Sequence, residues 1–204
     1  MKITRIIGGA LGTCTYVVSN EVTNECIVVD PHEEIKPISD YIQDDKLKPI
    51  AVLLTHGHFD HIGGVAFLKN MGAKVYMSKS DVWHIDNPEQ MAAYLGIKIE
   101  HFDVDVFVKD SDLLEIAGFK IKVIETPGHT KGGVCYVLDE YIFTGDTIFR
   151  ESYGRSDFED SDFKSLKSSI LKILNLEGEY TLLPGHGEET YLSFEKMYNP
   201  IMFD

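Results

Sequence analysis

Three histidines and a carboxylate fall within six residues in one stretch of this chain. They are His56, His58, Asp60 and His61, and they follow the apolar run 50–54. Imidazole nitrogen and carboxylate oxygen are common protein ligands of zinc and other divalent metals. A lone histidine would be interpreted as a surface or core side chain. Four such groups so close together predict a metal-binding loop.

Three further polar residues stand in a similar context. His129, Asp146 and His186 each come after a strand-like apolar run and beside a glycine, which lets the backbone turn sharply and approach a site. Because ligands of α/β proteins gather beyond the carboxyl ends of strands, these residues are expected to join the cluster. Five imidazoles and two carboxylates exceed what one four-coordinate ion takes. They predict two metal ions with open positions for water.

The pattern of apolar residues predicts the elements that position these groups. Asp81 is expected to cap a short helix that carries Val82, Trp83 and Ile85. Alternation predicts strands and helical spacing predicts helices, most clearly at 161–174. Strands are expected at 2–7, 13–19, 26–29, 49–54, 74–77, 104–108, 113–116, 119–125, 133–138, 141–143 and 180–183, and helices at 32–44, 63–71, twice within 80–100, and at 161–174 and 190–198.

This order neither alternates strictly between strands and helices nor describes a pure sandwich of strands. Two β-rich halves that each end in helices predict an α/β fold, a four-layer αββα sandwich. A chain of 204 residues suits one domain with its own core, so residues 1–204 are predicted to form a single domain.

Charge and composition exclude several classes of partner. Thirty-three acidic against nineteen basic side chains give a formal charge of −14, which repels phosphate backbones and anionic membrane surfaces. We therefore expect neither nucleic acid nor a membrane as partner. No apolar run approaches the roughly 20 residues that span a bilayer. The sequence predicts no particular oligomeric state.

The cysteines and the first residues indicate a cytoplasmic protein. Cys14, Cys26 and Cys135 are odd in number, widely spaced and set in apolar stretches, which predicts buried reduced thiols. The start could be taken for a signal peptide. Gly8 and Gly12 interrupt its apolar stretch, however, and no cleavage site follows.

The combined motifs resemble those of the metallo-β-lactamase superfamily. Its HxHxDH motif is met by the segment 56–61, and Asp30, His129, Asp146 and His186 follow the remaining motifs in order. The resemblance covers nearly the whole chain and implies the fold of that superfamily. It also implies a role for each residue: His56, His58 and His129 would hold one metal, Asp60, His61 and His186 the other, and Asp146 would bridge them.

Four residues lie outside this ligand set. The resemblance implies that Asp30 fixes the cluster loop by hydrogen bonds without binding metal, although a strand-ending Asp-Pro turn is the alternative. His32, His84 and His101 have no motif context and are expected at the surface.

The implied chemistry is hydrolysis by two divalent metal ions, with zinc expected and iron or manganese possible. A water shared between them is ionised near neutral pH, and the bridging hydroxide attacks a carbonyl. Asp60 and Asp146 are the candidate catalytic carboxylates. Asp60 could accept a proton, but its histidine neighbours favour a ligand role. No serine or cysteine nucleophile is required.

Departures from other branches of the superfamily narrow the activity. Position 58 is histidine where flavodiiron oxidoreductases carry glutamate, Asp146 stands where true β-lactamases lack a bridging aspartate, and −14 disfavours the RNA-binding surface of the nucleases. What remains resembles the glyoxalase II group, above all its short bacterial members. These enzymes hydrolyse small-molecule thioesters such as S-lactoylglutathione. The supporting segments are 144–149, 154–157 and 184–187.

The identity of the thiol carrier depends on less specific residues. Arg155 falls where larger glyoxalases place a lysine against the thiol, so it is a candidate contact for a substrate carboxylate. A charged surface residue is the alternative. Asp157 falls where those relatives have a tyrosine, so glutathione and other thiols both stay open as carriers.

Three other functions are compatible with parts of the same pattern. A persulfide dioxygenase uses a related ligand set with one iron and consumes oxygen. A lactonase would open a cyclic ester with the same hydroxide. A binding protein with a vestigial site would have lost ligands, whereas all seven are present here.

Overall fold

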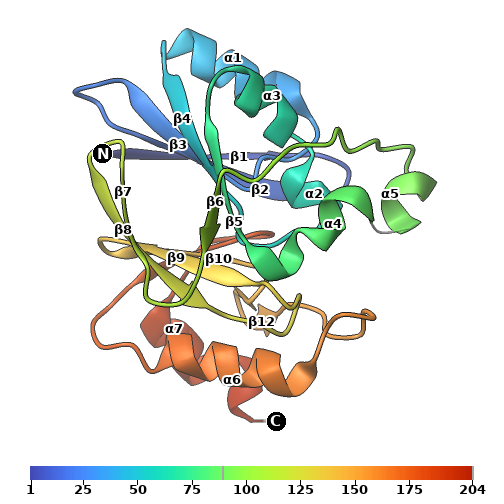
Figure 1. The fold of residues 1–204 in the computed structure, drawn as a ribbon. Helices are drawn as coiled ribbons and strands as arrows, with labels where there is room; N and C mark the ends of the chain where they lie inside the picture. Colours follow the sequence, from blue (N-terminus) through green and yellow to red (C-terminus); the bar gives the residue numbers. More distant parts are fainter. Residues whose placement is uncertain (89, 204) are drawn as a thin grey trace.

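Two six-stranded sheets pack face to face in the computed structural model, which describes residues 1–88 and 90–203 (Figure 1). Helices cover the outer face of each sheet, as the labels α1 and α3 on one side and α6 and α7 on the other show. The predicted α/β four-layer αββα sandwich is therefore confirmed.

The first sheet has the order β1-β2-β3-β4-β5-β6. Its first three strands are antiparallel, and β3 to β6 run parallel, so the carboxyl ends of β4 and β5 meet at the same edge. The strands are β1 Lys2–Gly8, β2 Thr13–Ser19, β3 Glu25–Val29, β4 Lys48–Leu53, β5 Lys74–Ser78 and β6 Val106–Val108.

The second sheet has the order β14-β13-β10-β9-β8-β7. Its strands are antiparallel except for β10 and β13, which run parallel and end side by side. The strands are β7 Leu113–Ile116, β8 Phe119–Glu125, β9 Val134–Leu138, β10 Tyr141–Gly145, β13 Thr181–Pro184 and β14 Thr190–Tyr191; β11 Ile148–Phe149 and β12 Ser152–Tyr153 form a separate ribbon.

The longer helices bury one face against the sheets. The helix α6, for example, packs Leu166, Ile170 and Ile173 against the second sheet, and its first residue is preceded by Asp162, which accepts a hydrogen bond from the backbone N–H of Ser165. The helices are α1 Ile35–Asp44, α2 Phe59–Ile62, α3 Val65–Asn70, α4 Trp83–Asp86, α5 Gln90–Tyr94, α6 Phe163–Leu174 and α7 Leu192–Tyr198, with 3-10 turns η1 Lys79–Asp81 and η2 Pro200–Met202.

The main core lies between the two sheets, where alternate residues of each sheet meet. It includes Tyr16 and Leu53 of the first sheet and Tyr136 and Phe143 of the second. The Tyr136 hydroxyl donates to the backbone oxygen of Leu54, which follows β4. The sheets are thus joined by apolar packing and by a buried hydrogen bond close to the carboxyl end of β4.

Several details of the sequence prediction are corrected. Asp81 does not cap α4, because its carboxylate turns inward and the residue before α4 is Val82. His32 and His84 are buried, with 0% and 3% exposure, and only His101 lies at the surface as expected. The helix predicted from residue 32 begins at Ile35, and the strand at 190–191 replaces the expected start of the last helix.

Other expectations are met. Cys14, Cys26 and Cys135 are buried free thiols. Ala117 and Gly118 form the predicted tight turn between β7 and β8, both with positive φ, 54° and 80°. In the described ranges 1–88 and 90–203, no helix has the length and apolar character needed to pass through a bilayer.

Candidate metal centre

The seven candidate ligands converge where the strands of both sheets end. His56 and His58 lie in the loop after β4, and α2 carries Asp60 and His61 one turn further on. The other three follow β8, β10 and β13 of the second sheet. They are His129, Asp146 and His186. Their convergence is a fact of the structure, and their role as metal ligands stays a prediction.

One set of three imidazoles lies between the two sheets. His58 Nδ1 and His129 Nε2 are 2.9 Å apart, and the His56 ring centre is 4.8 Å and 5.0 Å from those of His58 and His129. One nitrogen of each ring lies within 4.8 Å of the other two. Three buried nitrogens that converge in this way suit a divalent cation.

The second set combines one carboxylate with two imidazoles. His61 Nε2 lies 3.3 Å from His186 Nε2, and Asp60 Oδ2 lies 3.4 Å from the first nitrogen and 3.3 Å from the second. A tetrahedral cation bound at about 2.0–2.1 Å holds neighbouring ligand atoms about 3.3 Å apart. The spacing of this set therefore fits a bound metal ion closely.

Asp146 lies between the two sets. Its Oδ2 is 3.5 Å from His129 Nε2 of the first set and 3.5 Å from His186 Nε2 of the second. Its Oδ1 and the Nε2 of His56 are buried without a hydrogen-bond partner, which is costly unless a ligand satisfies them. The donor set and these two atoms together fit two metal ions that share a carboxylate.

Hydrogen bonds on the far side of three imidazoles fix which nitrogen faces the centre. The Nδ1 atoms of these rings donate to protein oxygens, so the Nε2 atoms are left as acceptors for a cation. His61 Nδ1 contacts Asp30 Oδ2 at 3.1 Å, His129 Nδ1 contacts the backbone oxygen of Arg155 at 2.8 Å, and His56 Nδ1 contacts Thr55 Oγ1 at 3.0 Å.

Asp30 connects the end of β3 to the cluster loop. Its carboxylate accepts from the backbone N–H and the hydroxyl of Thr55, at 2.8 Å and 2.6 Å, besides its contact with His61. Asp30 takes a left-handed φ of 48°, a conformation uncommon for residues other than glycine. An unusual backbone held by three hydrogen bonds indicates a positioning role for this carboxylate.

The glycines beside the later ligands leave room for close approach. Gly145, before Asp146, has a φ of 48° and packs against Thr55, and Gly128, before His129, has a φ of 141°. A Cβ at Gly185 would come 2.2 Å from Asp146 Oδ1. A side chain at position 185 would therefore displace the shared carboxylate.

Electrostatics divide the two sets. Burial lowers the pKa of His56 and His58 well below 6.5, so these imidazoles are neutral and able to bind a cation. Burial also opposes a charge on His61, but the carboxylates of Asp60 and Asp146 outweigh it and raise its pKa well above 6.5. The pKa of His186 is raised as well, against its burial, by its hydrogen bond to Asp60.

This difference predicts that the two sets lose metal at different pH. A cation must displace protons from His61 and His186, so metal binding there weakens as the pH falls towards 6.5. His56 and His58 start to compete for protons only below 6.5. We expect acidification of zinc-loaded protein to release the metal of the Asp60 set first, measured as zinc released per chain against pH. Simultaneous release of both ions would contradict this expectation.

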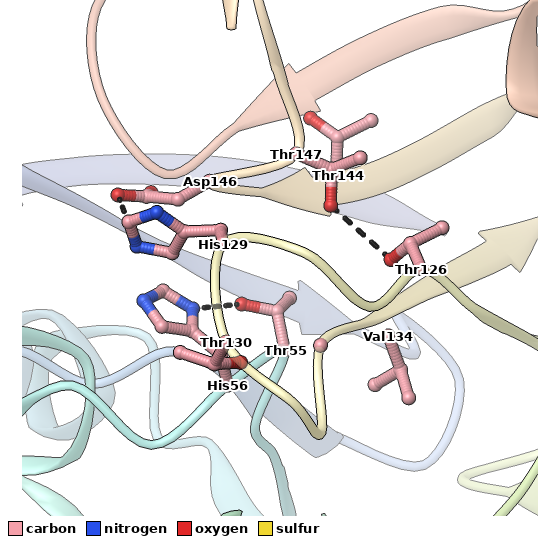
Figure 2. Close-up of a pocket in the computed structure, with 10 residues that line it drawn as sticks. Thr55, His56, Thr126, His129, Thr130, Val134, Thr144, Asp146 and Thr147 are labelled. Atoms are coloured by element: carbon pink, nitrogen blue, oxygen red, sulfur yellow. Dashed lines mark hydrogen bonds and ion pairs between the residues drawn. The ribbon is translucent and has the colours of Figure 1, made fainter. Parts of the chain in front are cut away.

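A small cavity adjoins His56 and His129. Its volume is about 10 Å³, close to the space of one water molecule. Figure 2 shows the His129 ring beside Asp146, the His56 ring beside Thr55, and the hydroxyls of Thr126 and Thr147 in contact. Hydroxyls therefore line the inner side of the first ligand set.

A larger cavity of about 680 Å³ opens beside His58. Its walls include Trp83, which is 60% exposed, and Phe158, whose ring centre is 5.3 Å from that of His58. Lys131 and Asp160 supply charge at its lining. The cavity gives a molecule from solvent a path to the first ligand set.

Arg155 lies near the centre, and its contact with a substrate carboxylate stays a prediction. Its backbone oxygen holds His129, and its exposed side chain forms two hydrogen bonds with Asp157, at 2.9 Å and 2.8 Å. The guanidinium also lies 4.6 Å from the Phe158 ring centre. A substrate carboxylate would have to compete with Asp157 for the side chain of Arg155.

Three contributors were not identified from the sequence. Phe158 forms a wall of the larger cavity, Asp81 binds the loops after β4 and β8, and the Thr13 hydroxyl donates to Asp60 Oδ2 at 2.7 Å. Asp81 follows the carboxyl end of β5, so the rule that found the ligands applies to it too. Nothing in the local sequence distinguishes Thr13 or Phe158.

Comparison with known proteins agrees with the fold. The family model of the metallo-beta-lactamase superfamily matches residues 7–186, and the chain belongs to that superfamily. A hydroxyacylglutathione hydrolase from Haemophilus influenzae is 30% identical, with 93% of this chain and 92% of the relative covered.

Two solved structures are similar over nearly their whole length. The BLEG-1 B3 metallo-beta-lactamase has a TM-score of 0.92 at 30% identity, with both chains fully covered. TTHA1623 in a di-iron-bound form has a TM-score of 0.85 at 32% identity, covering 97% of this chain and 98% of that one. The family and the clusters of His and Asp residues define the protein as a metal-dependent hydrolase of this superfamily.

Proposed function

We propose that the protein hydrolyses small-molecule thioesters at a centre of two divalent metal ions. The observation that carries the proposal is the two clusters of His and Asp residues on either side of Asp146, whose Oδ2 lies 3.5 Å from a nitrogen of each. The Oδ1 of Asp146 and the Nε2 of His56 are also buried without a hydrogen-bond partner. The similarity to a hydroxyacylglutathione hydrolase supports a thioester as substrate. The di-iron form of a similar structure supports two ions and leaves zinc, iron and manganese as candidates.

Two cations bound by these residues would supply a water ionised near neutral pH and would polarise a carbonyl group. The chain's own residues orient the site. Asp30 and Thr55 hold His61 and His56 with their Nε2 atoms inward, and the Phe158 ring shields one side of His58 and His129. The substrate carbonyl would approach through the cavity beside His58.

An alternative mechanism would use a cysteine as a covalent nucleophile, but no cysteine is suitably placed for it. All three cysteines are buried, and burial raises the pKa of Cys26 to about 12 and that of Cys135 to about 11. Burial also raises the pKa of Cys14. These thiols stay protonated near neutral pH and are poor nucleophiles, which favours attack by water.

Hydrolysis of β-lactams is the second candidate. It is favoured by the B3 metallo-beta-lactamase structure, which matches this chain over its full length. Asp146 favours the thioester, because true β-lactamases lack a bridging aspartate at this position. Both substrates contain a carbonyl that a bound hydroxide can attack, so only turnover separates them.

The test is elemental analysis of the purified protein followed by a substrate panel on the same sample. We expect two metal ions per chain and the fastest turnover with an acyl-glutathione thioester or another acyl thioester. A β-lactam and a lactone complete the hydrolytic arms, and oxygen uptake with a persulfide tests the dioxygenase alternative. Two ions without turnover of any thioester would overturn the thioester proposal, and a single iron with oxygen uptake would replace it.

Arg155 is proposed as a weak contact for acidic substrates. Because its side chain is exposed and already paired with Asp157, Arg155→Ala should raise the KM for an acidic thioester by less than about five-fold. Asp157→Asn should lower that KM, since it frees the guanidinium. A neutral thioester is the control for both variants. An unchanged KM of Arg155→Ala for every acidic thioester would contradict the contact.

A further inference from the structure

A buried carboxylate outside the seven candidate ligands binds two loops at once. Asp81 follows β5 and is fully buried. Its Oδ2 accepts from the backbone N–H of Gly57 at 3.0 Å and from the Thr130 hydroxyl at 2.7 Å, and its Oδ1 accepts from the backbone N–H of Gly132 at 2.5 Å. Three donors on one buried carboxylate form a satisfied network that fixes the groups it joins.

The groups that Asp81 joins lie in the two loops that carry the first ligand set. Gly57 lies between His56 and His58 in the loop after β4, and Thr130 directly follows His129 in the loop after β8. These loops extend from different sheets. Asp81 therefore sets the distance between the histidines that the two sheets contribute.

Gly57 and Gly132 leave room for the Asp81 carboxylate. A Cβ at Gly132 would lie 2.5 Å from Asp81 Oδ1, and a Cβ at Gly57 would lie 2.9 Å from the Asp81 backbone oxygen. Real Cβ atoms do not approach backbone or carboxylate oxygens so closely without displacing them. The absence of side chains at both positions is what lets the carboxylate reach the backbone N–H groups.

A different residue supports the second set. The Thr13 hydroxyl donates to Asp60 Oδ2 at 2.7 Å, and Thr13 forms an isolated β-bridge with His186. The next residue strengthens this contact, because the backbone N–H of Cys14 donates to the backbone oxygen of Gly185 at 2.7 Å. The start of β2 thus holds two of the three ligands of the Asp60 set.

We propose that Asp81 and Thr13 are positioning residues that hold the two ligand sets separately, so that each metal ion can be loosened without the other. The inference rests on the proposed two-metal function. Asp30 supports both sets, because it contacts His61 directly and His56 through Thr55. The hydrogen bonds of the Asp81 carboxylate go to the loops of the first set, and the Thr13 hydroxyl donates to Asp60 of the second.

The matched test is Thr130→Val against Thr13→Val. Both changes remove one buried hydroxyl at nearly constant volume, one beside each ligand set. Metal-stripped protein is titrated with Zn²⁺ in competition with a chelator, which resolves two dissociation constants. Thr13 contacts a ligand directly, so Thr13→Val should weaken one constant by about ten-fold, the low end for a partner of a metal ligand. Thr130 acts through Asp81, so Thr130→Val should weaken the other constant by less than that. Each variant should leave the remaining constant unchanged.

Asp81→Asn is the stronger variant. Whichever way the amide is turned, its NH₂ group faces a backbone N–H, of Gly57 or of Gly132, so a repulsion replaces a hydrogen bond. We expect a loss of about ten- to a hundred-fold in the same constant that Thr130→Val affects. If Asp81→Asn fails to fold, the valine pair decides the question.

Reference variants assign the constants and separate this inference from the proposed function. His129→Ala should remove the ion of the first set and His186→Ala that of the second. If neither changes metal binding, the two-metal function and this inference fall together. A second outcome is that each of these variants removes its own ion, while Thr130→Val and Thr13→Val either weaken both constants equally or change neither constant. In that case the two-metal function stands and the separate support of the two sets is overturned.

Discussion

His58→Ala is expected to abolish turnover and to leave one metal ion bound in place of two. Burial keeps His58 neutral, and its Nδ1 lies 2.9 Å from His129 Nε2, so the variant removes one of the three converging imidazoles of the first set. Loss of a partner of a metal ligand typically costs about 10- to 100-fold in affinity or activity, so loss of a ligand should exceed about a hundred-fold. Metal content and kcat/KM are measured on the same preparation.

The control for this variant is His101→Ala. His101 is exposed and forms a surface pair with Asp86 at 2.8 Å, so its removal should change neither metal content nor turnover. Near-full activity of His58→Ala in a sample of measured metal content would refute the assignment of His58.

Asp146→Asn is expected to weaken the binding of both ions, unlike the replacement of any single histidine. The carboxylate oxygens lie 3.5 Å from nitrogens of both ligand sets, and an amide removes a negative charge that both cations share. Turnover should fall at least as far as in His58→Ala. Titration of stripped protein with Zn²⁺ measures both constants.

Asp139→Asn provides a matched control at the other end of β10. Asp139 lies in the turn before β10, exposed and with a φ of 49°, a conformation that asparagine tolerates well. This variant should bind both ions normally. If Asp146→Asn weakened the binding of only one ion, Asp146 would belong to one set and would not bridge the two.

The sequence predicted the seven converging residues because each follows a strand with a recognisable apolar pattern. Strand ends that meet at one edge bring such residues together whatever the loops between them, which is why segments as far apart as 56–61 and 186 could be related. The four-layer order followed from the same strands. The family resemblance added the division into two sets, which spacing alone did not give.

What the sequence did not predict depends on contacts between distant residues. Asp81 resembled a helix cap because an aspartate directly before an apolar helical pattern is typical of one. Its actual hydrogen-bond donors, at 57, 130 and 132, belong to other loops. His84 resembled a surface residue, but it is buried and contacts Asp160 at 3.0 Å. Arg155 and Asp157 are close in sequence, yet the sequence could not show that their side chains pair and that the guanidinium is therefore already hydrogen-bonded.

The placement of the ligand sets at the junction of both sheets has a consequence for the lifetime of the protein. All three cysteines are free thiols, so no covalent cross-link joins the halves of the sandwich. Ions held by residues 56 to 186 would act as removable cross-links between the halves. A ligand that binds the folded chain and not the unfolded chain stabilises the folded state. The supply of metal in a cell would then govern how long a folded molecule survives proteases as well as how fast it turns over substrate.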